Sequence, residues 1–143
     1  MIRGIHHATF LTRDLAGARA FYEGVLGLRP SPNRPSMGFD GVWYDVAPQQ
    51  QLHLMLLPDP DAGSQRLAHP QEVRRGCMGL KPQQHTQHGG RDRHVALAVD
   101  DLAQLQARLD AAGIACTQSR SGRRALFCRD PDGNALEFIE VAG

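Results

Sequence analysis

HATFLTRDLA at residues 7–16 and HVALAVDDLA at residues 94–103 are two versions of one pattern, offset by 87 positions throughout. In both versions an aspartate follows the histidine by seven residues, and most of the other pairs match apolar with apolar. After each aspartate, apolar residues continue at the spacing of an amphipathic helix. Because the agreement extends beyond these ten residues, the repeat predicts a chain made of two similar halves.

Each half is predicted to contain one helix and four strands. The helices begin at the capping residues Asp14 and Asp101 and end at Gly27 and Gly113. The repeated segments supply the first strands, and the others are expected near residues 28–31, 41–46 and 51–57, then near 115–118, 124–128 and 135–141. This order of strand, helix and three strands, present twice, predicts an α+β fold.

The two halves divide the chain into modules within a single domain. We place the first module at about residues 3–57, a linker at about 58–92 and the second module at about 93–143. The linker is rich in Pro, Gly, Gln and His and lacks periodicity, so we interpret it as a loop that could act as a lid. We expect its histidines to be exposed rather than metal-binding: His69, His85 and His88.

Charge and composition exclude several classes of protein. The 16 Lys and Arg residues nearly balance the 15 Asp and Glu residues, so a nucleic-acid partner is not expected. No apolar run approaches the roughly 20 residues of a membrane span, so no membrane partner is expected either. The N-terminus has no apolar signal-peptide core. The three cysteines are an odd number without metal-ligand spacing, which indicates free thiols in a reducing cytoplasm.

Four polar side chains interrupt the apolar pattern of the predicted strands. Successive strand residues point to opposite faces of a sheet. His53 therefore points away from its leucine neighbours, and His94 shares a face with the small residues Ala96 and Ala98. By this parity each half sends one polar side chain inward from its first strand and one from its last. The four residues are His7, His53, His94 and Glu137.

Three imidazoles and a carboxylate in one cavity suit a divalent transition metal, with Zn, Ni, Mn and Fe as candidates. A carboxylate buried without a partner would be costly, which favours the same interpretation. A shift of one residue would exchange His7 for His6. The repeat selects His7, because Asp14 and Leu15 establish the register of the first strand.

Several motifs accompany these four residues in both halves. They are IHHA at 5–8, RDL at 13–15, AFYE at 20–23, VLGL at 25–28, QLHL at 51–54, RHVA at 93–96 and FCRDPDGNALE at 127–137. With these motifs the sequence resembles the vicinal oxygen chelate superfamily, which includes glyoxalases, fosfomycin-resistance proteins and extradiol dioxygenases. The resemblance covers both halves and leaves out mainly the linker.

The resemblance implies two βαβββ modules that form an open, cupped barrel around a divalent metal. Ligands in that family come from the first and last strands of each module, which implies His7, His53, His94 and Glu137 here, and substrate oxygens complete the coordination. The metal acts in the family as a Lewis acid or as a redox centre for O₂. Chains of this size commonly form homodimers, sometimes with shared sites, so we expect a homodimer that acts on a small molecule.

The residue at position 53 separates branches of the family. Lactoylglutathione lyases typically have a glutamate at the position of His53, where it helps to move a substrate proton. Fosfomycin-modifying enzymes and extradiol dioxygenases use two histidines and one carboxylate, a set matched by His7, His94 and Glu137. His53 is then either a fourth ligand or an acid/base group beside the metal. The candidate catalytic residues are Glu137 and His53.

Three functions remain open at this stage. The favoured one is a metal-dependent, glyoxalase-like lyase, isomerase or transferase that acts on a small oxygenated molecule. The alternatives are an Fe²⁺ extradiol-type dioxygenase and a protein that sequesters a drug or metabolite without chemistry. Arg120, Arg123 and Arg124 either hold a carboxylate or phosphate of the ligand or form a solvated turn. Gln51 either orients a ligand or simply ends a strand.

Overall fold

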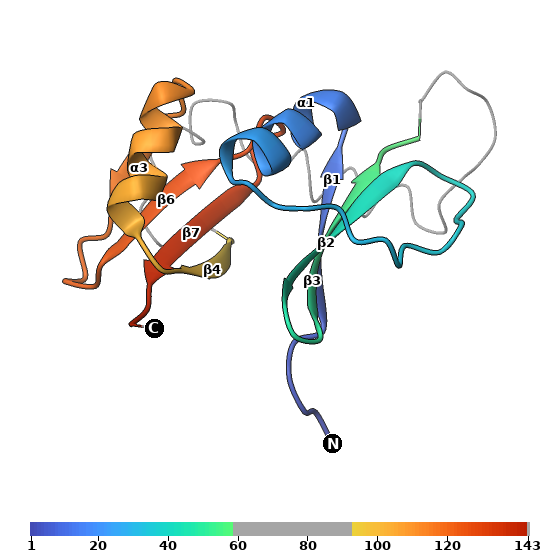
Figure 1. Cartoon of the computed structure of the whole chain (residues 1–143), viewed down its shortest axis with the longest axis horizontal. Helices are drawn as coiled ribbons and strands as arrows, with labels where there is room; N and C mark the ends of the chain where they lie inside the picture. The colour runs from blue at the N-terminus through green and yellow to red at the C-terminus, as the bar shows by residue number, and fades with distance from the viewer. Residues whose placement is uncertain (59–92, 143) are drawn as a thin grey trace.

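A computed structural model describes residues 1–58 and 93–142. It contains two mixed sheets with helices packed against them, which confirms the predicted α+β fold (Figure 1). The two sheets stay separate in the described part of the chain, so no closed barrel forms there. The predicted linker lies outside the described residues except for Pro58, and its three histidines lie outside them too.

The first half forms a three-stranded sheet in the order β1-β3-β2. Its elements are β1 (His7–Thr12), α1 (Leu15–Arg19), η1 (Ala20–Val25), β2 (Gly41–Ala47) and β3 (Gln50–Leu56). Strand β1 runs parallel to β3, and β2 is antiparallel to β3. The first and last strands of this half are therefore direct neighbours.

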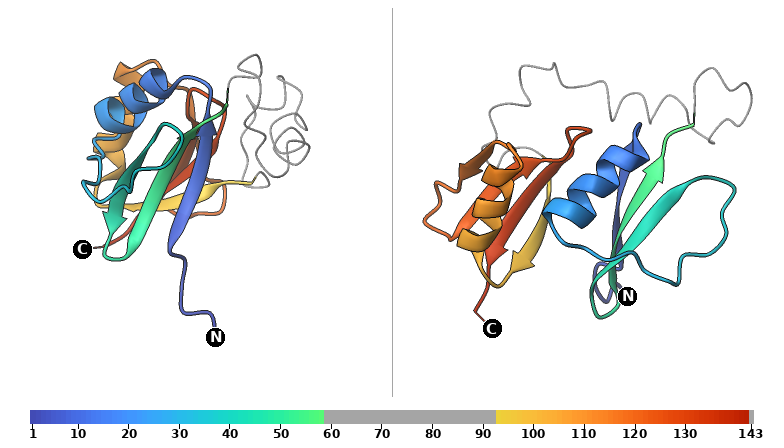
Figure 2. Two further views of the ribbon diagram at one scale, coloured as in Figure 1. Left: turned by 90° about the vertical axis from the view of Figure 1, so that its right-hand side faces the viewer. Right: turned by 45° about the horizontal axis from the view of Figure 1, so that its top comes forward.

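The second half forms a four-stranded sheet in the order β4-β7-β6-β5. Its elements are β4 (Val95–Val99), α3 (Leu102–Ala111), β5 (Cys116–Gln118), β6 (Ala125–Arg129) and β7 (Ala135–Glu140). Strand β4 runs parallel to β7, as β1 does to β3, so the sequence repeat is also a repeat of topology. The helices of both halves lie on the same side of the two sheets (Figure 2).

The helix caps follow the sequence pattern closely. The Asp14 side chain accepts a hydrogen bond from the backbone N–H of Gly17, and Asp101 does the same for Gln104. The first helix is not regular throughout, because α1 widens into the π-helical turn η1. There the Leu26 N–H reaches back five residues to the carbonyl of Phe21. This wide turn ends before Gly27, whose φ of 79° suits glycine.

One predicted strand is missing. The segment near residues 28–31 forms only a single bridge, between Pro30 and Tyr44, instead of a strand. Proline has no N–H to donate to a ladder, and Pro32 follows two residues later, so pairing cannot continue. The equivalent strand of the second half, β5, does form.

The core lies between the helices and one face of each sheet. Its largest fully buried side chains are Tyr22, Tyr44, Leu52, Leu54, Leu109, Leu126 and Leu136. On β4, Leu97 and Val99 pack against this core, as strand parity predicts. The opposite face of each sheet is therefore left for the polar residues. Among the described residues, no helix is long and apolar enough to cross a membrane.

A buried hydrogen bond joins the two halves. The Tyr22 hydroxyl donates to the Asp130 carboxylate over 2.8 Å, and both residues are buried. Asp130 opens the turn at 130–134, whose Pro, Gly and Asn residues favour a turn, and it also accepts from the side chain of Asn134. The Asn134 amide donates in turn to the Leu11 carbonyl in β1. The turn of one half is thereby held against the first helix and strand of the other.

Two of the three cysteines lie in the described residues. Cys116 and Cys128 are free thiols, as predicted, and they face each other across β5 and β6. Burial raises the pKa of the Cys128 thiol to about 12, so it stays protonated and unreactive at neutral pH.

Candidate metal centre

The four predicted ligands lie in or beside the strands that the sequence analysis named. His7 is the first residue of β1, His53 is in the middle of β3, and Glu137 is in β7. His94 directly precedes β4. Leu52 and Leu54, the neighbours of His53 on β3, belong to the core, so the His53 side chain lies on the opposite face of the sheet. The structure arranges the four residues as two pairs, one in each half.

His94 and Glu137 form the first pair. The Nε2 atom of His94 lies 2.9 Å from Oε2 of Glu137, and the Glu137 side chain is only 4% exposed. The other carboxylate oxygen, Oε1, is buried and has no hydrogen-bond partner in the described structure. The edge of the His94 ring meets Phe127, with ring centroids 5.6 Å apart. The buried carboxylate therefore retains one unsatisfied oxygen beside an imidazole.

His7 and His53 form the second pair. Their rings stack with centroids 4.3 Å apart and planes 13° apart. On the neighbouring strand β2, the Trp43 ring stacks on His53 at 4.1 Å and 4°. Because β3 lies between β1 and β2, the His53 imidazole is held between His7 and Trp43. His53 is buried, whereas His7 is exposed and its Nδ1 lies 3.0 Å from Nδ1 of His6.

A hydrogen-bond chain determines which nitrogen of His53 carries the proton. The Asp45 carboxylate accepts from the amide nitrogen of Gln51, which turns the Gln51 carbonyl oxygen toward His53. That oxygen lies 3.0 Å from His53 Nε2 and can only accept, so Nε2 must be the protonated nitrogen. The lone pair of a neutral His53 is then on Nδ1. This atom is buried and has no hydrogen-bond partner in the described residues.

The electrostatics of the second pair favour neutral imidazole. Burial, followed by the neighbouring His7 and His6, lowers the pKa of His53 to about 4. At neutral pH His53 is therefore uncharged, which is the form that binds metal ions.

Two unsatisfied atoms fit a divalent cation. Leaving a buried acceptor without a hydrogen bond costs about 1–3 kcal/mol, and among the described residues neither Glu137 Oε1 nor His53 Nδ1 has a hydrogen-bond partner. A cation would satisfy each of them. However, no group of three or more His, Cys, Asp or Glu residues in the described parts of the chain is arranged to hold an ion. The structure thus forms two half-sites and does not bring the four ligands together.

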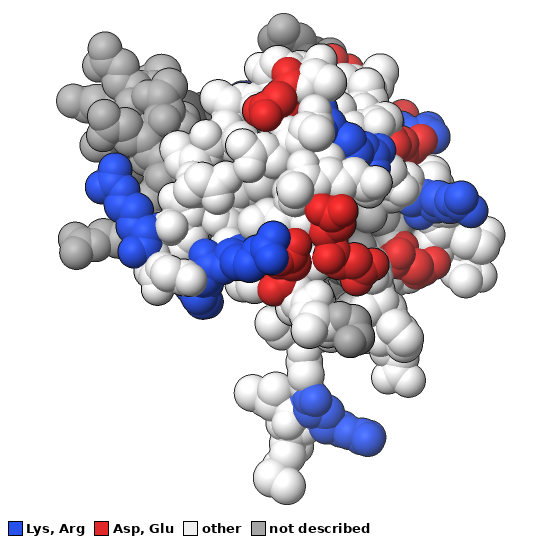
Figure 3. Space-filling model, turned by 60° about the vertical axis from the view of Figure 1, so that its left-hand side comes forward, with Lys and Arg blue, Asp and Glu red and all other residues white. Residues whose placement is uncertain are grey.

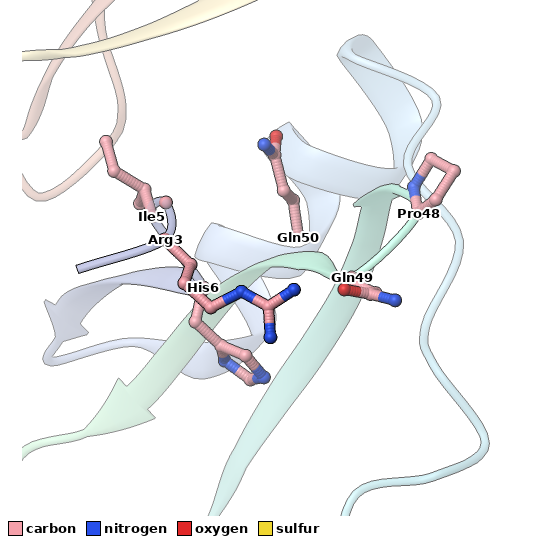
Figure 4. A pocket seen from close by; sticks show the side chains of 7 residues that line it. Arg3, Ile5, His6, Pro48, Gln49 and Gln50 are labelled. Atoms are coloured by element: carbon pink, nitrogen blue, oxygen red, sulfur yellow. The ribbon is translucent and has the colours of Figure 1, made fainter. Parts of the chain in front are cut away.

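One pocket near the first half does not coincide with this centre. A pocket of about 260 Å³ lies between the N-terminal segment and the turn after β2, lined by Arg3, Gly4, Ile5, His6, Pro48, Gln49 and Gln50 (Figure 4). It contains none of the four predicted ligands. It includes His6, the residue that the sequence repeat had set aside in favour of His7.

The sequence pattern does not reveal one residue of the first half-site and one residue at the contact between the halves. Trp43 belongs to none of the motifs of the sequence, although its place on the strand paired with residues 50–56 puts it directly opposite His53. Asp130 lies in a Pro, Gly and Asn-containing segment typical of a turn. Its burial against Tyr22 depends on docking between the halves, which no local pattern reveals.

Comparison with known proteins identifies the superfamily of the chain. The family model for the Glyoxalase/Bleomycin resistance protein/Dioxygenase superfamily matches residues 4–138. The chain belongs to this superfamily. The resemblance inferred from the motifs is therefore confirmed.

Individual members of the superfamily match along nearly the whole chain. The uncharacterized protein YaeR of Escherichia coli is 27% identical over 145 residues, covering 97% of each chain. A glyoxalase family protein from Bacillus anthracis has a TM-score of 0.67 at 20% identity, covering 98% of this chain and 96% of that one. Lactoylglutathione lyase from Agrobacterium tumefaciens has a TM-score of 0.60 at 24% identity, covering 98% and 95%. At these identities the solved structures establish the fold alone.

Proposed function

We propose that this protein is a divalent-metal-dependent enzyme of the glyoxalase type, a lyase, isomerase or transferase acting on a small oxygenated molecule. One observation carries the proposal: among the described residues, His53 Nδ1 and Glu137 Oε1 are both buried and have no hydrogen-bond partner. These two atoms belong to the last strands of the two modules, where the superfamily pattern expects ligands. Unsatisfied buried acceptors at both positions would be costly unless a cation binds them.

The proposed ligands are His7, His53, His94 and Glu137. A divalent cation at such a centre would supply Lewis acidity toward a substrate oxygen. Glu137 contributes the negative charge, and its burial removes competing water. The Gln51 carbonyl oxygen accepts a hydrogen bond from the protonated Nε2 of His53, which keeps the lone pair on Nδ1 available for a metal ion. Trp43 covers one face of the His53 ring and restricts its orientation.

We also propose that the centre is completed in a homodimer. Each half-site holds two of the four ligands, and the described chain keeps the half-sites apart. In a twofold dimer, the His7–His53 pair of one subunit can face the His94–Glu137 pair of the other. The dimer would then hold two equivalent centres.

Metal analysis tests the catalytic proposal. Protein purified without chelator is expected to contain, or to take up, close to one equivalent of Zn²⁺, Ni²⁺, Mn²⁺ or Fe²⁺ per chain. Less than a tenth of an equivalent, with no uptake on addition of any of these ions, would argue against an enzyme and for a sequestering protein. Oxygen consumption with Fe²⁺ and a panel of catechols separates dioxygenase activity from the proposed reactions.

Mixing two variants tests the shared centre. His53→Ala and His94→Ala each damage both sites of their own homodimer. After mixed refolding, a heterodimer with shared sites carries both mutations in one site and leaves the other intact. We expect about a quarter of the wild-type metal sites to return in a statistical mixture. If each site lies within one chain, no metal binding returns.

A further inference from the structure

Arg123 lies at the entrance to the second half-site. It precedes β6 by two residues and shares strand parity with Phe127, which pairs directly with Glu137. Its side chain is 61% exposed, and Nη2 lies 3.7 Å from Glu137 Oε1. This separation is an ion pair without a hydrogen bond. The guanidinium thus reaches the unsatisfied oxygen of the candidate ligand without satisfying it.

The adjacent arginine behaves differently. Arg124 Nε lies 2.6 Å from Glu140 Oε2, and Glu140 also accepts the backbone N–H of Leu102 at the start of α3. The Arg124 guanidinium is therefore committed to a carboxylate that caps a helix on the other face of the sheet. Arg123 is anchored more lightly, through Nε to the hydroxyl of Ser121 at 3.2 Å. The two neighbouring arginines therefore have different environments: Arg124 is paired with Glu140, whereas Arg123 lies beside the half-site.

Small residues line the sheet beside Glu137. Ala96 on β4 pairs with Glu137 on β7, and Ala125 on β6 pairs with Ile139 on β7. Phe127 is the direct neighbour of Glu137 on β6, and its ring edge meets His94. The chain as a whole does not supply a strong positive field, because its formal net charge at pH 7 is +1. On the face shown in Figure 3, Arg side chains lie next to Asp and Glu side chains. Any attraction for an anion at this position therefore has to be local.

We infer that Arg123 binds an anionic group of the substrate, a carboxylate or a phosphate or phosphonate, next to the metal centre. This inference rests on the proposed function. In the metal-free protein the charge of Glu137 opposes an incoming anion and attracts Arg123. A cation bound to Glu137 offsets that negative charge. The Arg123 guanidinium is then available to bind an anion through paired, charge-assisted hydrogen bonds. Arg123 is in this way a specificity-determining residue.

The test uses the metal-loaded full chain and two simple probes. Methylphosphonate and acetate are titrated separately by calorimetry at constant ionic strength, so that the two kinds of anion are distinguished. Arg123→Gln is expected to weaken binding of the preferred probe about tenfold or more, the loss expected for a charge-assisted pair. The probe affinity of Arg123→Lys should lie between those of wild type and Arg123→Gln, because lysine keeps the positive charge but cannot make the paired hydrogen bonds of a guanidinium. Arg124→Gln is the matched control, and its affinity for the probe should remain within about twofold of wild type.

The metal affinity of each variant is measured first, so that failure of the anion site can be distinguished from failure of the proposed metal-dependent function. If Arg123→Gln binds metal normally and binds both probes as wild type does, the inference is wrong and the proposed function stands. Equal losses in Arg123→Gln and Arg124→Gln would also overturn it, because they would show only a general charge effect. If no variant and no wild-type protein binds metal, the proposed function fails and the anion site fails with it.

Discussion

Trp43 and His53 stack face to face on neighbouring strands, with ring centroids 4.1 Å apart and planes 4° apart. Trp43 is the single tryptophan of the chain. Its emission therefore reports on the first half-site without interference from another tryptophan. Binding of Ni²⁺ or Co²⁺ by His53 should quench most of this emission, whereas Zn²⁺, which has a filled d shell, should change it little. Normal Ni²⁺ uptake with unchanged emission would show that His53 is not a ligand.

Matched titrations of His94→Ala and His53→Gln distinguish a ligand from an acid/base group. Loss of His94 should sharply weaken metal binding while the fold survives, because Leu97 and Val99 pack on the other face. If the working ligands are His7, His94 and Glu137, His53→Gln should retain metal and change turnover only. If all four residues bind, the two variants should lose metal affinity to a similar extent. That equality would rule out the three-ligand set.

The tautomer of His53 should depend on Gln51. Gln51 accepts from His53 Nε2 and is itself oriented by Asp45. Gln51→Leu removes this acceptor, so the proton can move to Nδ1 and block the proposed ligand atom. We expect metal affinity to fall about 10–100-fold, as for other groups that orient a ligand. Gln50→Leu, at an exposed neighbouring position, is the control, and similar losses in both variants would refute this role.

Stability of the metal-free protein should fall in mild acid. The pKa of His53 is lowered to about 4 in the folded chain, whereas an unfolded histidine titrates near 6.5. Between these values the unfolded chain binds more protons, so the free energy of unfolding decreases as the pH falls through this window. The contribution of His53 is at most about 3 kcal/mol. Denaturant titrations at pH 7 and pH 4.5 should show a smaller difference for His53→Gln than for wild type.

The bond between the halves should matter more than a comparable bond within one half. Tyr22→Phe deprives the buried Asp130 carboxylate of its donor, and we expect a loss of about 1–3 kcal/mol in the free energy of unfolding. Tyr44→Phe is the control, because the Tyr44 hydroxyl donates to the partly exposed Glu23 in its own half. A loss in Tyr44→Phe equal to or larger than that in Tyr22→Phe would contradict the prediction.

Much of this fold is visible in the amino-acid sequence because its signals are local. The two aspartate caps, the alternation along 94–99 and the turn at 130–134 are each determined within a few residues. The repeat of 87 positions extends those signals to both halves and makes His7 equivalent to His94. His53 and Glu137 occupy the last strand of each half, at similar but not identical distances from those histidines. The periodic pattern does not predict two features of the structure, the missing strand near Pro30 and the π-helical turn η1.

Tertiary structure decided what surrounds those four residues. The neutral Nδ1 of His53 depends on Asp45 and Gln51, and its place between two rings depends on the strand order β1-β3-β2. The burial of Glu137 depends on β7 lying between β4 and β6. These properties arise from desolvation and from contacts between distant segments, whose energies exist only once the chain is packed. Residue types alone therefore indicated the chemistry, and packing determined which atoms are left to perform it.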